Sequence, residues 1–299
     1  MTDAHKNVAM INDDPFAPVQ LRNIENAGRK TDKFWVEIED SETNEFREIP
    51  GVGVVHGSDY QLVSNRQVHD MAVGVLDETG MVYKPLPTFG AGHSEPLNWN
   101  GRRFSAKWFV EDAAVDVPGG SKMMLGVEAR NSYDGSCKVG LAFFAMHLVC
   151  SNQFYSNNLL GTPFVFPHVN KGGNLEEDIG LAMAQIRAQA AGFVKVGPNM
   201  RMLQDTRVDK FTDFLALREQ LKATAGLEFR DKVILDELSG RGPSAAMEIP
   251  TADYSDPSTY WSIGNAYTAV CTHQVGGVRG ADQSGRVIDF LLNSASKVA

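Results

Sequence analysis

The sequence predicts an α+β protein in which antiparallel strands, arranged as hairpins and a meander, pack against helices, with a helical C-terminal half. Three observations support this class. Apolar residues alternate with polar residues in several segments before residue 170. From about Asn174 onward, the apolar period changes from two to 3.6. Turn residues, including an Asp-Gly step, separate the early segments, as tight hairpins require.

The same patterns divide the chain into an arm and one folded body. Residues 1–30 are polar, carry Pro15 and Pro18 and show no clear period, so we expect a flexible N-terminal arm. Because single cores stop growing near about 300 residues, the remainder fits one domain. We expect this α+β domain over residues 31–299, β-rich over 31–170 and helix-rich over 171–299.

Composition excludes several classes of protein. The 299 residues are 43% hydrophobic and 22% charged, which is enough apolar material for a large core. The N-terminal segment has no basic stretch followed by an apolar one, and no window approaches about eighteen apolar residues. Cys137, Cys150 and Cys271 are widely spaced and form no CxxC pair, as in a reducing compartment. We expect a cytoplasmic protein with no membrane partner.

The net charge limits binding to nucleic acid. A formal charge of −9 counts against a surface that binds nucleic acid everywhere, since that affinity depends on neutralising phosphates with Lys and Arg. A local basic patch remains compatible with this charge. An acidic surface also has a simpler explanation, because many cytosolic proteins stay soluble in this way.

Strand signals begin just after the expected arm. Residues Lys33–Glu39 alternate apolar and charged side chains, and Glu45–Ile49 alternate again after a polar turn, which predicts a hairpin. Three further strand-like segments follow a Pro- and Gly-rich connection and predict a meander: Arg102–Val110, Lys122–Asn131 and Lys138–Cys150. The last two are joined by a turn in which Asp134-Gly135 supplies the positive φ that tight turns need.

Helices are predicted from capping and period. Ser64 and Gln67 have the spacing of a capping box, and Gly80 is placed to end the helix that follows. Its buried stripe is Val68, Met71, Ala72, Val75 and Leu76. In the C-terminal half we expect four helices, marked by Ile179–Ala190, Phe211–Leu221, Tyr260–Cys271 and a short one at Val287–Leu292.

Four motifs carry a resemblance to a known family. They are Gly53–Asn65, Asn131–Ser136, Val149–Asn152 and Trp261–Thr268, in this order along the chain. Together they resemble the signatures of the phage- and plasmid-encoded family called domain of unknown function 932. That family often has an arginine shortly before its third motif, where this chain has His147, which weakens any anion-binding role there. The resemblance implies a mobile-element origin, a location in the host bacterial cytoplasm and an unassigned biochemical role.

The motif residues also have structural explanations. Asp134 is typical of a turn residue that bonds its own backbone, although a role as ligand or acid is the alternative. Asn265 is expected to clamp a helix to the sheet, Asn152 to cap a turn, and Cys150 to be buried at a strand end. The motif residues that we interpret as structural are Tyr60, Asn65, Asn131, Asp134, Gly135, Cys150, Asn152, Trp261 and Asn265.

Catalytic and cofactor motifs are missing from the sequence. It contains no P-loop, dinucleotide fingerprint, HExxH, GxSxG or EF-hand loop, so we predict no cofactor. His147 and Cys150 would lie on opposite faces of one strand and not act as a base and nucleophile. Four histidines, His56, His93, His147 and His168, lack the short spacing of metal ligands, so no metal site is predicted.

The expected meander also offers a candidate nucleic-acid surface. Basic residues follow its strands and interleave with Trp99, Phe104, Trp108 and Phe109, as sequence-tolerant single-strand binding requires. The alternative is an ordinary sheet with one polar face and one core face. The candidate residues are Arg102, Arg103, Lys107, Trp108, Lys122, Arg130 and Lys138.

These features lead to three hypotheses about function. The first is a non-catalytic phage or plasmid protein of DNA metabolism that binds or anneals single-stranded DNA, as an oligomer of further copies of the chain. The order strand, turn, strand, helix also resembles phage annealing proteins, by analogy of fold alone. The second is an interaction protein that modulates a host or defence factor. The third, an enzyme with an unrecognised site, is open but less favoured.

Overall fold

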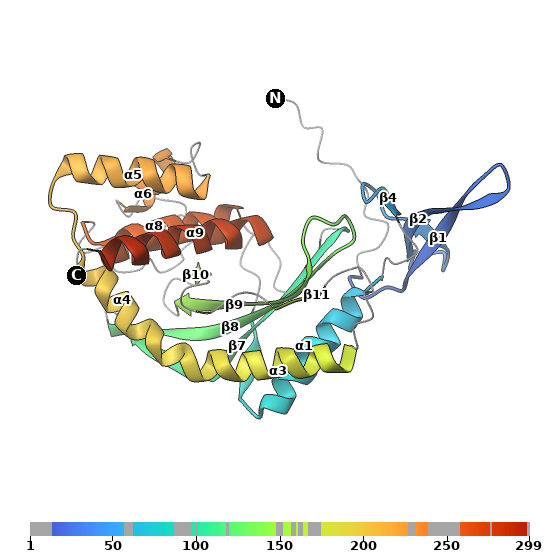
Figure 1. The fold of residues 1–299 in the computed structure, drawn as a ribbon, viewed down its shortest axis with the longest axis horizontal. Helices are drawn as coiled ribbons and strands as arrows, with labels where there is room; N and C mark the ends of the chain where they lie inside the picture. The colour runs from blue at the N-terminus through green and yellow to red at the C-terminus, as the bar shows by residue number, and fades with distance from the viewer. Residues whose placement is uncertain are drawn as a thin grey trace.

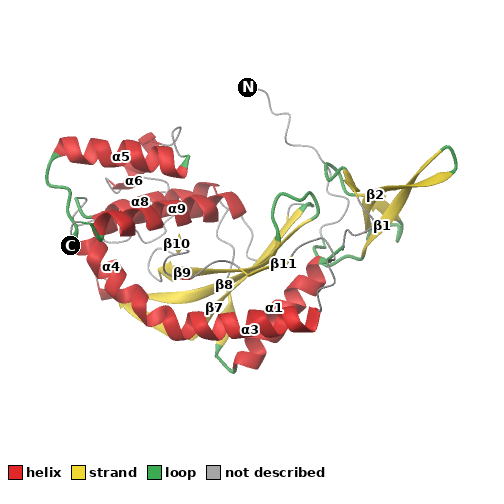
Figure 2. Ribbon diagram, in the orientation of Figure 1, coloured by secondary structure: helices red, strands yellow, loops and turns green. Residues whose placement is uncertain are grey.

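The computed structural model confirms the α+β class, with two antiparallel sheets and helices in the C-terminal half (Figure 1, Figure 2). Among the residues singled out above, Tyr60, Cys150, His93 and His168 lie outside the described part of the chain. The structure describes residues 14–56, 62–86, 97–99, 101–117, 120–147, 152–156, 160, 164–166, 175–226, 231–238, 258–275 and 277–297.

The smaller sheet is built from the N-terminal strands. Strand β2 (Arg29–Glu39) pairs antiparallel with β1 (Val19–Asn26), β3 (Phe46–Glu48) and β4 (Val54–His56). The pairing of β2 with β3 confirms the predicted hairpin. Figure 1 shows the β1–β2 hairpin extending away from the rest of the molecule.

The predicted flexible arm is wrong from Val19 onward, where the chain forms β1. The two residues between the strands, Ala27 and Gly28, both have positive φ, of 51° and 75°, and fold β1 back onto β2. Val19 and Leu21 then pack against a small core that contains Val36. The mostly polar composition concealed this strand, because only one of its faces contacts apolar residues.

The larger sheet contains the predicted meander. Its strands follow the order β10-β9-β8-β7-β5, with β11 on β9 and β6 on β7, and every pair is antiparallel. At the turn between β8 and β9, Gly135 has φ 68° and Asp134 Oδ1 accepts a hydrogen bond from Ser136 N at 2.9 Å. The strands are β5 Tyr83–Pro85, β6 Leu97–Trp99, β7 Arg103–Val117, β8 Ser121–Ser132, β9 Val139–His147, β10 Gln153–Phe154 and β11 Phe164–Phe166.

The first helix begins and ends as predicted. Ser64 forms a complete capping box with Gln67, and Gly80 ends α1 in the left-handed conformation. The last helix is longer than expected, since α9 starts at Gly277, and α4 and α6 are additional helices. The helices are α1 Asn65–Thr79, α3 Leu175–Gly192, α4 Val196–Asp205, α5 Phe211–Ala225, α6 Asp231–Leu238, α8 Tyr260–Val270 and α9 Gly277–Ala295, with a short 3₁₀ turn at Phe193–Lys195 and a π turn at Cys271–Val275.

Helices contact both faces of the larger sheet. In Figure 1, α3 and α4 form an arc along one side of the sheet, and α8 and α9 lie across its opposite side at one end. The main core joins residues of the meander, such as Val127 and Leu141, to helix residues such as Ile186. A second, smaller core lies where Ala281 of α9 meets Phe144 and Tyr155. Within the described residues, none of the helices has the length and apolar character that a membrane span needs.

Candidate functional site

Strand β8 separates an apolar face of the sheet from a polar one. Leu125, Val127 and Ala129 point into the main core, and all three are fully buried. Side chains alternate along a strand, so Glu128 and Arg130 point to the opposite face. Both of these charged residues are buried as well. A buried ionised pair is costly unless it is matched by partners, so this polar face is our candidate site.

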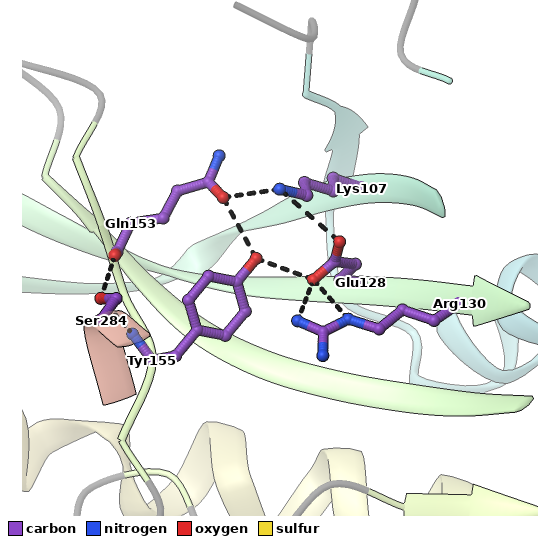
Figure 3. Close-up of polar contacts among 6 residues, drawn as sticks. All are labelled: Lys107, Glu128, Arg130, Gln153, Tyr155 and Ser284. Atoms are coloured by element: carbon purple, nitrogen blue, oxygen red, sulfur yellow. Dashed lines mark hydrogen bonds and ion pairs between the residues drawn. The ribbon is translucent and has the colours of Figure 1, made fainter. Parts of the chain in front are cut away.

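The polar face carries a compact group of side chains, which we call the ion cluster: Lys107, Glu128, Arg130, Gln153 and Tyr155 (Figure 3). Arg130 donates to Glu128 Oε2 through Nε at 2.8 Å and through Nη2 at 2.5 Å. Tyr155 Oη donates to the same oxygen at 2.8 Å, and Lys107 Nζ lies 3.6 Å from Glu128 Oε1. Three neighbouring groups therefore stabilise one carboxylate.

Hydrogen bonds attach the ion cluster to helix α9. Lys107 Nζ donates to Gln153 Oε1 at 2.6 Å, and Ser284 Oγ donates to the backbone oxygen of Gln153 at 2.8 Å. Ser284 also accepts from the backbone N–H of Tyr155 at 3.4 Å. The segment that holds Gln153 and Tyr155 is thus fixed between the meander and a helix more than a hundred residues later in the chain.

Burial and charge act against each other in this cluster. Burial opposes ionisation of Glu128, but Arg130 and Lys107 outweigh it and lower the pKa of that carboxyl to about 2. Burial lowers the pKa of Lys107, and the neighbouring Glu128 only partly offsets this. Burial raises the pKa of Tyr155 well above its ordinary value, and the Glu128 charge raises it further. At neutral pH, Glu128 is charged and Tyr155 is a neutral donor.

A cavity of about 230 Å³ lies beside the ion cluster, between the meander and α9. The Arg130 guanidinium borders it and lies over the Tyr155 ring, with 5.2 Å between the guanidinium carbon and the ring centroid. Charged residues of both signs line the cavity, which therefore has the polarity of a binding site for a small polar ligand. Its lining is Arg130, Ala142, Phe143, Tyr155, Ser156, Ala281, Asp282, Gly285, Arg286 and Asp289.

The predicted basic and aromatic surface is wrong for three of its residues. Trp108 lies on the apolar face, is 4% exposed and packs in the main core. Lys107 and Arg130 belong to the ion cluster, and their side chains are only 13% and 11% exposed. The basic residues and tryptophan of this meander therefore lie on opposite faces of the sheet, because neighbouring positions of a strand point in opposite directions.

The other four basic candidates are exposed, at opposite ends of the meander. Arg102, Arg103 and Lys138 lie around the Asp134-Gly135 turn, and we call these three residues the turn patch. Arg103 Nε is 3.4 Å from Asp134 Oδ2. Lys122 pairs with Asp116 at the far end of β8, about 30 Å away at about 3.4 Å per residue. The structure thus brings three of the seven candidates together at the surface.

The first two family-like motifs meet in one buried hub. Asn131 Nδ2 donates to Asn65 Oδ1 at 2.8 Å and to the backbone oxygen of Val63 at 2.9 Å. The backbone N–H of Asn65 donates to Tyr133 Oη at 3.1 Å, and Asn65 Nδ2 to the backbone oxygen of Pro15 at 2.8 Å. These bonds join the start of α1, the end of β8 and the N-terminal segment. The structural interpretation of Asn65 and Asn131 agrees with these contacts.

The last two motifs meet in a second hub, in which the helix and the sheet are joined by a different asparagine from the one predicted. Asn265 Nδ2 donates to Trp261 O within its own helix at 3.0 Å. The contact between helix and sheet comes instead from Asn152, whose Nδ2 donates to Asn265 O at 3.2 Å. Asn152 Oδ1 also lies 3.1 Å from His273 Nε2, and Trp261 stacks on Phe154 with 5.8 Å between ring centroids. The clamp expected from the Asn265 side chain is therefore provided by Asn152.

His147 lies on the apolar face of β9, edge-on to Trp261 with 5.6 Å between the ring centroids. It is 2% exposed, and this burial lowers its pKa to about 4. A buried neutral imidazole in this position packs as a core residue. In the part of the chain that the structure describes, no group of three His, Cys, Asp or Glu side chains is placed to hold a metal ion.

Sequence reasoning missed Glu128, Gln153 and Tyr155. One signal was present, because Glu128 is two residues from Arg130 and therefore shares its face of the strand. The pairing of Glu128 with Lys107 depends on the register of β7 with β8, which places these residues directly opposite. No comparable local signal marks Gln153 or Tyr155, whose positions depend on α9.

No protein-family model, curated protein or solved structure matches this chain. The resemblance to the domain of unknown function 932 family therefore stays a prediction that rests on the four sequence motifs. The contacts within the two hubs explain these motifs structurally. We accordingly argue function from the site residues themselves.

Proposed function

We propose that this protein binds single-stranded DNA at the turn patch and acts, without catalysis, in DNA annealing or a related step of phage or plasmid DNA metabolism. The observation that carries the proposal is the gathering of Arg102, Arg103 and Lys138 around one turn. All three side chains are exposed, although the chain as a whole has a charge of −9. A local excess of cations on an acidic protein is the minimum that phosphate binding requires.

The surroundings of the turn patch suit a single strand. Trp99 is half-buried nearby, with its ring 6.0 Å from that of Tyr133, the residue just before the turn. A partly exposed indole next to arginines provides a surface on which a base can stack. The Arg102 side chain lies close to the backbone of Gly51. A Cβ atom added to Gly51 would be 2.9 Å from Arg102 Nη1. Arg102 of the patch therefore lies close to the turn between β3 and β4.

Asp134 limits the strength of this site in the unbound protein. Burial opposes its ionisation, but hydrogen bonds from Ser136 and the charges of Arg103 and Arg102 lower the pKa of its carboxyl. The carboxylate therefore competes with a phosphate for Arg103. We infer that binding is weak for each protomer, and that annealing would require several copies along one strand.

A salt series of fluorescence anisotropy with a labelled single-stranded oligonucleotide tests the proposal. Changing Arg102, Arg103 and Lys138 together to Ala should weaken binding and reduce the magnitude of the salt slope by about 0.7 for each phosphate that the variant no longer neutralises. Lys122→Ala is the matched control, because Lys122 is an exposed cation of the same meander at its far end. Equal binding by the triple variant and the wild type would contradict the proposal.

Asp134→Asn offers a test in the opposite direction. An asparagine oxygen can still accept from Ser136 N, so the turn should persist while the competing charge is removed. We expect DNA affinity to rise about two- to fivefold at low salt, the range that exposed ion pairs usually support. Unchanged affinity, measured in the same anisotropy assay, would show that Arg103 does not contact phosphate.

A second function is favoured by the edge of the smaller sheet. Strand β3 exposes Phe46, which is 37% exposed, and is flanked by the exposed carboxylates of Glu42, Glu45 and Glu48. Arg22 lies 3.0 Å from Glu48, so this edge carries charges of both signs around one exposed aromatic side chain. Such a surface suits a protein partner, such as a host factor. Pulldown from host lysate with the wild type and with Phe46→Ala tests it, and a partner captured equally by both proteins would contradict this surface.

A further inference from the structure

The cavity between the meander and α9 has a fixed cation on its inner wall. Arg130 donates Nε and Nη2 to Glu128, and its third nitrogen, Nη1, takes no part in these two bonds. In Figure 3 this nitrogen points away from Glu128. The Tyr155 ring beneath the guanidinium and the two bonds to Glu128 hold it in one orientation. Such a donor is preorganised for a ligand oxygen.

Cations outnumber carboxylates inside the ion cluster, and Asp282 and Asp289 balance this charge over the cavity as a whole. The ion cluster combines two cations, Lys107 and Arg130, with the single carboxylate of Glu128. A second guanidinium, Arg286 of α9, lines the cavity from its exposed side. The two guanidinium groups can both donate charged hydrogen bonds to one oxyanion in the cavity.

The lining also contains two carboxylates, which restrict the type of anion. Asp289 accepts a hydrogen bond from Ser156 Oγ at 2.5 Å, and Asp282 is exposed at the α9 side. Both would accept hydrogen bonds from a ligand hydroxyl or ammonium group. The volume of about 230 Å³ is smaller than the roughly 300 Å³ at which drug-sized pockets begin, so the ligand is small.

We propose that this cavity binds the phosphate or carboxylate group of a small ligand that also carries hydroxyl or amino groups. Arg130 and Arg286 bind the oxyanion, while Asp282 and Asp289 accept from the donor groups. This site is separate from the turn patch and does not depend on the proposed function. Two sources of the oxyanion fit this chemistry, a free small molecule and the terminal phosphate of a DNA strand.

Isothermal titration calorimetry of the full chain tests the proposal with three probes: inorganic phosphate, the mononucleotide dTMP and L-serine. We expect at least one probe to bind, and Arg286→Ala to weaken that binding about tenfold or more, as loss of a charged hydrogen bond does. Arg279→Ala is the control, because Arg279 is an exposed arginine two turns earlier on α9 and does not line the cavity. Binding of none of the probes, or equal binding by Arg286→Ala, would overturn the proposal.

Arg130→Lys gives a second test on the inner wall. Lysine keeps the charge facing Glu128 but removes the third nitrogen, so probe binding should fall while the circular dichroism spectrum remains that of the wild type. If this variant unfolds, the Arg286 result alone decides the proposal. If a folded Arg130→Lys protein bound the probe with the affinity of the wild type, the proposed role of Nη1 would be overturned.

The source of the oxyanion is distinguished with two oligonucleotides that differ only in a 5′-phosphate. Preference for the phosphorylated strand, lost in Arg286→Ala, supports a DNA end as ligand, whereas probe binding without such preference supports a free small molecule. The triple variant of the turn patch should retain probe binding in either case. Failure of DNA binding at the turn patch and failure of this site are therefore separate results.

Discussion

The two faces of strand β8 are both buried but are held together by different interactions. On one face, Val127 and Ala129 lie in an apolar core that is stabilised by the packing of apolar side chains. On the other face, Glu128 and Arg130 are buried because each charge has a partner within hydrogen-bond distance. An apolar face tolerates changes of similar volume, whereas a buried ion cluster depends on every member. A polar strand face can therefore be as buried as an apolar one.

The largest effect is expected for Glu128→Ala, which would leave Lys107 and Arg130 as buried cations without their carboxylate. Breaking a buried pair by removing one partner typically costs about 3–5 kcal/mol of unfolding free energy. Urea denaturation followed by circular dichroism measures this change. A loss below about 1 kcal/mol would show that the cluster is far more hydrated than its burial indicates.

The next largest loss of stability is expected for Gly126→Ala, which disturbs packing on the polar face. Gly126 pairs across the strands with Phe144, and an added Cβ would lie 2.2 Å from the Phe144 ring. Gly126→Ala should therefore destabilise the protein by up to about 3 kcal/mol. Gly74→Ala is the control, because Gly74 is exposed in α1 with nothing within 4 Å, and it should stabilise by about 0.5–1 kcal/mol. Similar losses in both variants would contradict a specific clash.

A pH effect is expected from the apolar face. The pKa of His147 is about 4 in the folded protein, below its ordinary value of 6.5, so the unfolded chain binds the proton more readily. Stability is therefore complete above pH 6.5 and decreases as the pH falls towards 4, by about 2 kcal/mol at pH 5. Denaturation midpoints of the wild type and His147→Gln at pH 8 and pH 5 measure it, and equal pH dependence in the two proteins would contradict this assignment.

The smallest effect is expected for Lys107→Met. This change removes one of the two cations but keeps the two bonds between Glu128 and Arg130, and the methionine fills a similar volume. Replacing a buried ionic side chain by an apolar one is often nearly neutral, so we expect a change below about 1 kcal/mol. A loss as large as that of Glu128→Ala, in the same urea experiment, would show that Lys107 is as important as Arg130.

Much of the fold could be predicted from the sequence. The capping box of Ser64 and Gln67, the helix end at Gly80 and the turn at Gly135 depend on neighbouring residues, and each appears as predicted. Strand β1 was missed because its apolar face contacts a small core contributed by other segments. Helix α9 was predicted too short because its first turns contact the polar sheet face through small residues such as Ala281 and Gly285, which give no apolar stripe.

The candidate site was much less predictable. The sequence shows which residues of the meander are basic, but its pattern predicts that Lys107 and Arg130 lie on an exposed surface. Their burial depends on Tyr155 and on Ser284, which is 131 residues away from its hydrogen-bond partner Gln153. The turn patch was predictable in part, because Arg102, Arg103 and Lys138 flank segments joined by recognisable turns.

The sequence specifies the period of each segment, the caps and turns that end it, and therefore the α+β class. These features depend on residues within a few positions of one another, where steric and hydrogen-bonding preferences act locally. The tertiary structure sets which polar residues of the meander are buried, which remain at the surface, and where the cavity beside Arg130 lies. The reason is that burial and ion pairing depend on partners distant in the chain, and no local pattern records them.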